Sequence, residues 1–392
     1  MTELRPCPVC GSGDARRLAR QSFEVLAGSL VNGYDVVCCE ACGMTYASGL
    51  PSPEEFTSYY TGMSKYEHAV TSYFSSPEDE ARCDSVVDMV DAIEPDRSLA
   101  ILDVGCSTGA LLAAFKRRGY TDLEGLDPSP ACGKVARDTH DILVRTGTAA
   151  DVATLPRRFG LLILSAVLEH LVDPLQALRD AWQVLDADGL LFVEVPDVEG
   201  FAECAGAPFQ EFSVEHINYF SAASLSSLLR RAGFTDAVVE RRQLPWRSGV
   251  RVPVVHAVFR KTASGAPAER DEVSEAALTA YIQESERIEA DVSSRIRKLA
   301  DEGRAVLVWG VGTHTRHLLK AGALDDLQVA AWVDSDPKVQ GTEMRGIPVI
   351  GPEAVRQRTE AILVSSGTVH HEILRQIRDD LGLDNEVVLL YD

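Results

Sequence analysis

The amino-acid sequence predicts an α/β protein in which a doubly wound parallel sheet stands between a small cysteine-rich N-terminal segment and a second, Rossmann-like α/β unit. Three observations lead to this prediction. Strand-like and helix-like segments alternate from about residue 76 to 262, and the same alternation begins again at Arg304. In both series the first strand ends in a glycine-containing turn. Two Cys-x-x-Cys-Gly motifs lie before the first series.

The bulk composition favours a cytoplasmic protein, and its length suggests about two or three domains. The 392 residues are 45% hydrophobic, and the mean hydropathy of −0.03 suits buried cores without membrane spans. No apolar run approaches the roughly 18 residues that a bilayer requires. The start, MTELRPCPVC, lacks the basic and apolar segments of a signal peptide. We therefore expect no membrane association.

The charge balance argues against nucleic acid as a partner. Lys and Arg number 38 against 59 Asp and Glu, a formal net charge of −21, and such a surface repels phosphate backbones. A small anionic substrate would need local basic residues. The nine cysteines are interpreted as metal ligands or buried apolar residues rather than disulfides, because a cytosolic chain is kept reduced.

The four cysteines of the two N-terminal motifs predict a structural zinc site. CPVCG contains Cys7 and Cys10, and CEACG contains Cys39 and Cys42. Each motif puts two thiolates on a tight turn, and two such turns supply the tetrahedral sulfur site that zinc accepts. Cys38 is set aside because only Cys39 has the two-residue spacing to Cys42. A redox-active pair is the alternative.

The first α/β series follows the strand–helix order that a parallel doubly wound sheet requires. LAILDVG and ALLAAFKRRG give the first strand and helix. DLEGLDPS, RFGLLILS and GLLFVEVPD give further strands, with a helix near 175–185 before the last one. A linker, KTASGAPAERDE, follows at Lys261–Glu272. The predicted domains are therefore 1–75, 76–262 and 263–392.

The third domain is expected to begin with a long amphipathic helix. Apolar residues recur there at mostly three- and four-residue steps with charges between them; they are Leu278, Ile282, Ile288, Val292, Ile296 and Leu299. From Arg304 onward, the stretches RAVLVWGVGTHT, VAAWVDSDP, IPVIGPE and AILVSSG predict the Rossmann-like sheet.

The turn after the first strand has the composition of a nucleotide-binding turn. LDVGCSTGALL contains Asp103, Gly105 and Gly109, and such a turn lets a ligand lie against the backbone at a helix N-terminus. Its Gly-x-x-x-Gly spacing differs from the Gly-x-Gly-x-x-Gly of dinucleotide folds. Asp127 ends the second strand, where a carboxylate can bind both hydroxyls of a ribose. Asp151 in GTAAD is a weaker candidate for contact with an adenine amino group.

These elements resemble those of the class I S-adenosylmethionine-dependent methyltransferases. The resemblance covers the first α/β series and includes VLEHLVDP at 167–174 and EVPD at 194–197. It implies that S-adenosyl-L-methionine is the cofactor, bound by the aspartates and glycines named above. Another nucleotide-binding Rossmann-like protein is the alternative. Glu169 and His170, within VLEHLVDP, are expected to serve the structure near the cofactor rather than the chemistry.

A second Glu-His pair, Glu215 and His216 in FSVEHINYFS, is the candidate for the chemistry. A sulfonium methyl donor needs no activation, but an oxygen acceptor must lose a proton and a carbon acceptor must become an enolate. A histidine with a pKa near neutrality suits either task, and a neighbouring carboxylate can orient it. A hydrogen-bonded loop without a catalytic role is the alternative.

The order of the segments resembles more closely the sugar C-methyltransferases of deoxysugar biosynthesis, which join cysteine motifs, a methyltransferase core, a Glu-His-x-x-Tyr-Phe segment and a Rossmann-like domain. This resemblance implies a nucleotide-linked 4-keto-deoxysugar as substrate, with His216 removing the C3 proton and Glu215 as its partner. That family commonly carries tyrosine two residues before the glutamate, where this sequence has Ser213. The stretch YYTGMSKYEH offers substitutes for the missing phenol: Tyr59, Tyr60 and Tyr66.

The glycine turn of the third domain, GVGTHT, has Gly310 and Gly312 but Thr315 in place of the third glycine of an NAD fingerprint. An NAD site is therefore only an alternative, and the resemblance implies a domain that closes over the active site without binding nicotinamide. Basic residues beside the turn would then meet an anionic substrate at a helix N-terminus. The residues expected to bind substrate are Tyr66, Tyr219, Arg247, His314 and Arg316, with Arg251 as a further candidate for a diphosphate.

Two other functions stay open at this point. An O- or N-methyltransferase acting on a sugar or another secondary metabolite has a similar domain order, and a non-catalytic, zinc-stabilised binding protein could keep such a core. The intact set of Gly105, Gly109 and Asp127 argues against the second. We expect a monomer or homodimer that acts on a small molecule.

Overall fold

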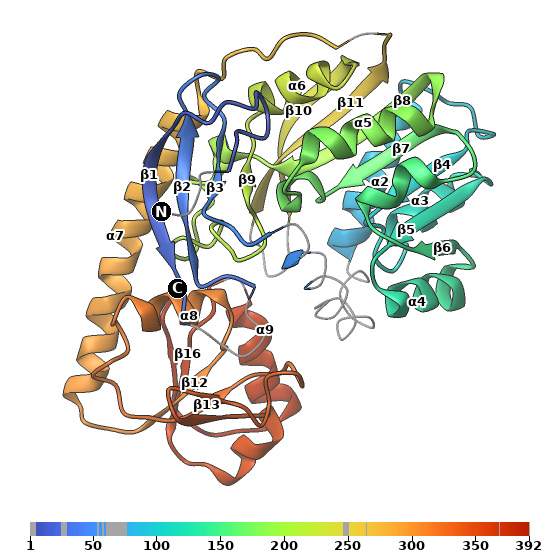
Figure 1. The fold of residues 1–392 in the computed structure, drawn as a ribbon. Coiled ribbons are helices and arrows are strands. Elements are labelled where there is room, and N and C mark those ends of the chain that lie inside the picture. Colours follow the sequence, from blue (N-terminus) through green and yellow to red (C-terminus); the bar gives the residue numbers. More distant parts are fainter. Residues whose placement is uncertain are drawn as a thin grey trace.

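The computed structural model describes residues 5–24, 30–52, 55–56, 59, 77–245, 251–263, 265–367 and 369–391. Three sheets lie within these residues, of four, seven and six strands. Figure 1 shows the N-terminal sheet above the C-terminal one, with the long helix α7 (Ser274–Asp301) alongside and the seven-stranded sheet beside them. The predicted α/β fold class is confirmed, because parallel strands dominate the two larger sheets.

The N-terminal sheet is completed by a strand from far along the chain. Its strands are β1 (Ala15–Ser22), β2 (Gly33–Cys39), β3 (Thr45–Ser48) and β9 (Asn218–Tyr219), antiparallel in the order β1-β2-β3-β9. Across the last pair Thr45 faces Tyr219 and Tyr46 faces Asn218. This pairing ties the FSVEHINYFS segment to the cysteine-rich part of the protein.

The seven-stranded sheet has the strand order β10-β11-β8-β7-β4-β5-β6. Its strands are β4 (Ile101–Val104), β5 (Leu123–Asp127), β6 (Leu143–Thr146), β7 (Phe159–Ser165), β8 (Leu185–Pro196), β10 (Phe234–Pro245) and β11 (Arg251–Lys261). All are parallel except β11, which runs antiparallel to both of its neighbours. The chain moves outward from β4 through β5 and β6 and then returns to the other side of β4 at β7. Open α/β sheets bind ligands outside the carboxyl ends of the strands at such a reversal.

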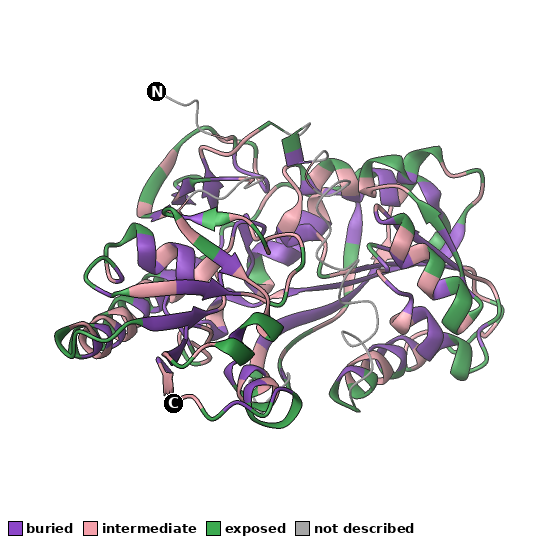
Figure 2. Ribbon diagram, turned by 90° about the horizontal axis from the view of Figure 1, so that it is seen from below, coloured by how far each residue is buried: buried purple, intermediate pink, exposed green. Residues whose placement is uncertain are grey.

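Helices cover both faces of this sheet, as the doubly wound prediction requires. The helices are α2 (Pro77–Asp91), α3 (Ala110–Arg117), α4 (Pro130–His140), α5 (Pro174–Val184) and α6 (Ala222–Arg231). Apolar residues of α5 and α6 belong to one hydrophobic cluster, and those of α2, α3 and α4 to another. Six of the seven residues of β7 are buried, because both of its faces are covered. Figure 2 shows the strands mostly buried and the outer helix surfaces exposed.

The C-terminal sheet repeats the same design on a smaller scale. Its strands are β12 (Val306–Trp309), β13 (Val329–Val333), β14 (Glu343–Met344), β15 (Ile347–Ile350), β16 (Ala361–Val364) and β17 (Val387–Leu389), in the order β14-β15-β13-β12-β16-β17. Only β14 runs antiparallel to its neighbour. The chain reverses direction across the sheet at β12, which lies between β13 and β16, so this sheet has a second switch point. Helices α8 (Thr313–Lys320) and α9 (His370–Arg375) accompany it.

The expected long helix is present as α7, and four of its six predicted apolar positions are buried: Leu278, Val292, Ile296 and Leu299. The remaining short helical turns are η2 (Ala149–Thr154), η3 (Leu168–His170), η4 (Val198–Gly200), η6 (Pro352–Gln357) and the π-helical η7 (Gln376–Asp380). Among the residues described, no helix combines the length and the apolar character needed to cross a membrane.

Candidate active site

One cavity of about 690 Å³ lies outside the carboxyl ends of β4, β5, β7 and β8. Part of its wall is the turn 105–107 together with Asp127. Glu215 and His216, which stand far from that turn in the sequence, form another part. The residues expected to hold a nucleotide and the pair expected to move a proton therefore share one cavity.

The glycine turn brings backbone close to the cavity at the start of α3. Gly105 and Gly109 have φ angles of 76° and 80°, in the left-handed region that favours glycine. A Cβ atom at Gly105 would stand 2.8 Å from Val167 Cγ2, and one at Gly109 would stand 3.1 Å from Ala136 Cβ. Both positions therefore require glycine for conformation and for space. The resulting turn can present N–H groups to a ligand.

Asp127 holds this turn and also faces the cavity. Its Oδ2 accepts the Ser107 N–H at 2.8 Å, and its Oδ1 accepts the Ser129 N–H at 2.9 Å. Burial raises the pKa of Asp127, while the two N–H groups act in the opposite direction. Each carboxylate oxygen has a further lone pair that can accept a ribose hydroxyl. Asp103 also lines the cavity and is buried. Its burial and, to a smaller extent, the charge of Asp127 raise the pKa of Asp103 well above its usual range.

Asp151 takes a different position from the one expected. Its Oδ2 accepts the Thr148 N–H at 2.7 Å and the Thr148 hydroxyl at 3.0 Å, which caps η2. The described lining residues of the cavity here are 147–150, and the Asp151 carboxylate is turned to its own helix cap. The structure therefore brings residues 147–150, rather than Asp151, to the cavity.

A short loop presents Glu215 and His216. The Ser213 hydroxyl accepts the N–H groups of both residues, at 3.2 and 3.0 Å, as in a serine-based turn. The Tyr59 hydroxyl donates to Glu215 Oε1 at 3.1 Å. One of the three candidate tyrosines thus contacts the pair, and the serine that stands in place of the expected tyrosine fixes the loop instead.

The histidines of the two Glu-His pairs meet in this cavity. The rings of His170 and His216 lie edge to face, with 4.9 Å between their centroids. His170 Nδ1 is 3.1 Å from the backbone oxygen of Glu215. Because a carbonyl oxygen only accepts, Nδ1 of His170 carries a proton and donates it in this hydrogen bond.

Glu169 is the most deeply buried member of this group. Its exposed fraction is 1%, and its Oε1 lies 3.7 Å from His170 Nε2. Its Oε2 has no hydrogen-bond partner among the residues described. Burial raises the pKa of Glu169 to about 8. The sequence predicted a structural role near the cofactor for Glu169 and His170, and both residues line the cavity that contains the glycine turn.

Arg5 and Asn218, which no sequence pattern marks, connect the segments that carry the two pairs. Arg5 Nη2 donates to the carbonyls of Leu171 and Val172 and to Asn218 Oδ1, at 3.2, 2.7 and 2.8 Å. Asn218 Nδ2 donates to the carbonyls of Leu168 and Leu171, both at 2.8 Å. One guanidinium and one amide therefore hold the loop after β7 against the strand β9.

Replacing Arg5 should destabilise the protein, because the Val172 carbonyl and Asn218 Oδ1 would lose this charged donor. A hydrogen bond to a charged group contributes about 1.5–3 kcal/mol, and an unsatisfied buried acceptor costs a similar amount, so we expect Arg5→Met to lower the free energy of unfolding by about 2–4 kcal/mol. Urea denaturation followed by tryptophan fluorescence measures this. Arg5→Lys, which keeps the charge without the planar set of donors, should lie between wild type and Arg5→Met. Equal stability of Arg5→Met and wild type would show that the carbonyls find other donors.

Two residues expected to bind substrate lie away from this cavity. Tyr219 is 1% exposed, and its hydroxyl donates to that of Tyr34 at 3.2 Å within a packed apolar cluster. The buried Arg316 directs its Nε to the carbonyl of Glu24, at 2.7 Å. Their side chains therefore join elements of the fold. Two further candidates, Tyr66 and Arg247, and the alternative phenol of Tyr60 lie outside the described residues.

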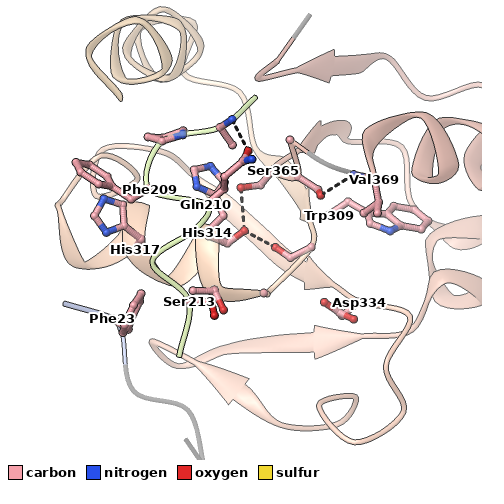
Figure 3. Close-up of a pocket in the computed structure, with 18 of the residues that line it drawn as sticks. Phe23, Phe209, Gln210, Ser213, Trp309, His314, His317, Asp334, Ser365 and Val369 are labelled. Carbon is pink, nitrogen blue, oxygen red and sulfur yellow. Dashed lines mark hydrogen bonds between the residues drawn. The ribbon is translucent and has the colours of Figure 1, made fainter. Parts of the chain in front are cut away.

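A second cavity, of about 400 Å³, lies at the carboxyl ends of β12, β13 and β16. Figure 3 shows that the C-terminal domain and the segment before Glu215 line it together, with His314, Asp334, Phe209, Gln210 and Ser213 around the space. His314 is hydrogen-bonded to the Tyr391 hydroxyl, and burial lowers the pKa of His314 to about 3. A neutral His314 offers hydrogen bonding rather than positive charge to a ligand.

The four predicted cysteine sulfurs come together in the N-terminal domain. Cys7 Sγ lies 3.5 Å from Cys42 Sγ, and Cys10 Sγ lies 3.5 Å from Cys39 Sγ. All four sulfurs are within 4.8 Å of one another. Zn–S bonds of about 2.3 Å in a tetrahedron place the sulfurs about 3.8 Å apart, so this arrangement fits zinc. Cys38 points elsewhere, with its Sγ 3.6 Å from Glu275 Oε2.

Known protein families match two parts of the chain. A family described as "Methyltransferase domain" matches residues 78–239, which contain the glycine turn, Asp127 and both Glu-His pairs. A family described as "C2185-like, N-terminal" matches residues 302–389, the C-terminal sheet and its helices.

Individual relatives include methyltransferases of several kinds. The C-methyltransferase NovU of Streptomyces niveus is 25% identical over 370 residues, covering 88% of this chain and 86% of NovU. A ubiquinone biosynthesis O-methyltransferase of Azorhizobium caulinodans is 33% identical over 107 residues, 26% of this chain and 42% of the relative. Among solved structures, the 1,6-didemethyltoxoflavin-N1-methyltransferase of Burkholderia thailandensis has a TM-score of 0.42 and 19% identity, covering 56% of this chain and 96% of that chain. The similarity to NovU extends over most of both chains, whereas the O-methyltransferase is matched over less than half of its length.

Proposed function

Because the chain carries a class I S-adenosylmethionine-dependent methyltransferase domain, we propose that it C-methylates a nucleotide-linked keto-deoxysugar through a base-generated enolate. The observation that supports this most is the single cavity that Asp127 and the glycine turn share with Glu215 and His216. Similarity to a C-methyltransferase over most of the chain supports carbon as the acceptor atom.

In the proposed reaction His216 removes a proton from the carbon next to the ketone, and the C–H electron pair forms the enolate. When bound, S-adenosyl-L-methionine supplies an electrophilic methyl group that the enolate carbon takes as the carbon–sulfur bond breaks. His216 then releases its proton to water. Glu215, which precedes His216 in the same loop and lines the same cavity, is the proposed partner of the base, since a carboxylate in reach of a histidine favours its charged form.

The Tyr59 hydroxyl takes the place of the tyrosine that this sequence lacks at Ser213. Its hydrogen bond to Glu215 Oε1, at 3.1 Å, holds the carboxylate that partners the base. Its ring also lines the cavity, where a sugar would lie. A phenol is therefore available to the substrate although it comes from another segment.

The second cavity suits the nucleotide end of such a substrate. The segment 207–216 lines both cavities. Residues 207–210 and Ser213 line the C-terminal cavity. Glu211, Glu215 and His216 line the active-site cavity. A ligand that crosses this segment would reach the N-terminal end of α8 with its anionic part, and N–H groups at that position favour anions. We infer that the C-terminal domain holds the nucleotide while the sugar reaches His216.

We infer that Cys7, Cys10, Cys39 and Cys42 bind one structural zinc ion. Four sulfur ligands close the coordination sphere and leave no position for substrate. The metal would hold together the short chain segments around the N-terminal sheet. Arg5 stands two residues before Cys7, so the zinc site would also fix the guanidinium that joins the segments carrying the two Glu-His pairs.

Asp127→Ala is expected to weaken S-adenosylhomocysteine binding about 100-fold. Two ribose hydroxyls that donate to a charged carboxylate contribute roughly 3 kcal/mol together, which corresponds to about two orders of magnitude in Kd. Titration calorimetry measures this. Asp151→Ala is the matched control, because its carboxylate caps η2, and its affinity should stay near wild type. Equal losses in both variants would instead assign the Asp151 carboxylate to the ligand, and an unchanged Asp127→Ala would place the ribose elsewhere.

The identity of the product tests the proposed function. The protein would be incubated with methyl-¹³C-labelled S-adenosyl-L-methionine and a set of thymidine-diphosphate-linked 4-keto-6-deoxyhexoses, and the product examined by carbon NMR. The proposal expects the labelled methyl group on a ring carbon, at the chemical shift of a carbon-bound methyl and with long-range correlations to the sugar protons. A labelled methyl ether would contradict it and favour O-methylation, the reaction named in the shorter 33%-identical match.

A further inference from the structure

We propose that Glu169 acts as a neutral carboxylic acid that donates a hydrogen bond to the ketone oxygen of the substrate as this oxygen becomes negative. The inference rests on the proposed enolate reaction. It supplies the hydrogen-bond donor that this reaction needs at the ketone oxygen. A base removes the proton, but the charge that develops on oxygen needs a donor placed in advance, away from water. Glu169 is in the cavity wall and is otherwise without a chemical role.

The surroundings of the Glu169 carboxyl favour its protonated form. The residue is 1% exposed, and its Oε2 meets no partner among the residues described. Side-chain oxygens buried this deeply are normally paired, and an ionised carboxylate with an unpaired oxygen is costly to bury. The backbone N–H of Glu169, which hydrogen-bonds its own carboxyl, acts to lower the pKa, but burial has the larger effect. Burial accordingly raises the pKa of Glu169 to about 8. A proton on this group removes the charge and leaves an O–H available for a ligand.

Two histidines and one arginine act on this carboxyl: a ring nitrogen of His170 and one of His216 lie within 4.8 Å of it, and Arg82 affects its pKa. The other titratable or charged residues that line the same cavity include Tyr59, Asp79, Cys83, Asp103, Asp127, Asp173, Asp180, Glu194, Glu211 and Glu215. His170 donates its Nδ1–H to the backbone oxygen of Glu215 and turns its Nε2 toward Glu169 Oε1, at 3.7 Å. Arg82 acts to lower the pKa of Glu169, but its guanidinium forms an ion pair with the buried Glu194. The positive charge of Arg82 is thereby matched by Glu194.

The position of Glu169 relative to His216 suits the two ends of an enolising ketone. A carboxyl oxygen of Glu169 and one ring nitrogen each from His170 and His216 lie within 4.8 Å of one another. The proton to be removed and the ketone oxygen stand on adjacent carbons of the substrate. A sugar that offers its C–H to His216 can therefore place its oxygen against Glu169.

The step moves one proton and leaves Glu169 unchanged. The C–H bond breaks, its proton goes to His216, and its electron pair becomes the carbon–carbon double bond of the enolate as the carbonyl electrons move onto oxygen. The Glu169 O–H donates to this oxygen and keeps its own proton. When the carbon gains its methyl group the ketone returns, and the hydrogen bond weakens to its initial strength.

Two substitutions separate a neutral acid from an ionised carboxylate. Glu169→Gln keeps the size and a neutral donor, whereas Glu169→Leu removes the donor. Deuterium uptake from D₂O into a thymidine-diphosphate-linked 4-keto-6-deoxyhexose, with S-adenosylhomocysteine bound, reports enolate formation without methyl transfer. We expect Glu169→Gln to exchange within about 10-fold of wild type and Glu169→Leu to lose about 100- to 1,000-fold, the effect of removing one oxyanion donor.

The pH profile gives a readout that a purely structural role would not change. Since the pKa of Glu169 in the folded protein is about 8, the wild-type exchange rate should fall as the pH rises through that value and the acid ionises. An amide does not titrate there, so this fall should be absent in Glu169→Gln. Affinity for S-adenosylhomocysteine and the melting temperature show whether each variant is folded.

Each outcome decides the proposal. If Glu169→Gln loses as much as Glu169→Leu, the group works ionised, as a base or as a cation ligand with His170 and His216, and the proposal is wrong. If Glu169→Leu exchanges like wild type, Glu169 has no part in the reaction. If Glu169→Leu fails to fold, the pH profile of Glu169→Gln decides alone. Absence of exchange in the wild-type protein would overturn the enolate reaction itself, a failure distinct from these.

Discussion

His216→Asn is expected to lose about 1,000-fold in both solvent exchange and methyl transfer, within the range that a general base contributes. Asparagine resembles the imidazole in polarity but cannot accept a proton near neutral pH. The imidazole of His216 stands in the cavity wall, edge to face with the ring of His170. Because removal of the proton precedes methyl transfer in the proposed reaction, both measurements should fall together.

The control for this prediction is cofactor binding. The Ser213 hydroxyl holds the loop through backbone N–H groups, so His216→Asn should keep the loop and bind S-adenosylhomocysteine near wild-type affinity. Glu215→Gln should lower the rates of solvent exchange and methyl transfer by only about 10-fold, because a residue that assists the base usually contributes less than the base itself. Methyl transfer that persists in His216→Asn would show that another group removes the proton, and Glu215 would then be the next residue to test.

Loss of the proposed zinc ion is expected to unfold the segment that contains the four cysteines. Binding of zinc and folding of a small site are one process, with apparent free energies of about 10–16 kcal/mol in isolated zinc-finger peptides. The double substitution Cys39→Ser with Cys42→Ser should therefore abolish zinc binding and expose the cysteine-rich segment to protease. Because β3 pairs with β9 and Arg5 bonds to Asn218, methyl transfer should be lost with it.

Cys38→Ser is the matched control for the metal prediction. Cys38 is adjacent to Cys39 and is also buried, but its Sγ faces Glu275 rather than the other sulfurs. This variant should keep one zinc per chain in elemental analysis and keep its activity. Wild-type protein without zinc after purification in metal-containing medium, or full zinc retention in the double variant, would contradict the assignment.

The sequence predicted the parts of the fold that depend on neighbouring residues. The alternation of strands and helices, the left-handed glycines at 105 and 109 and the long helix α7 are encoded within short segments, where periodicity and glycine placement are informative. The convergence of the four cysteines also followed from spacing alone. These features therefore could be derived without the structure.

The contacts that complete the cavity depend on residues far apart in the sequence, and no local pattern encodes them. Arg5 reaches Asn218, and Tyr59 reaches Glu215, only once the sheets are assembled. Tyr219 was expected at the substrate for its place in a motif, but pairing of β9 with β3 carries its ring into the apolar core. Glu169 had a structural interpretation because its burial beside a cavity is a property of the assembled fold.

The central claim is that proton removal from carbon precedes methyl transfer, and solvent exchange in the wild-type protein tests it most directly. The protein would be placed in D₂O with S-adenosylhomocysteine and a thymidine-diphosphate-linked 4-keto-deoxyhexose, and the proton next to the ketone followed by NMR. We predict that deuterium replaces this proton at a rate at least equal to that of methyl transfer with the active cofactor. A carbon-bound proton that stays unexchanged while the same protein methylates the same sugar would contradict the enolate reaction.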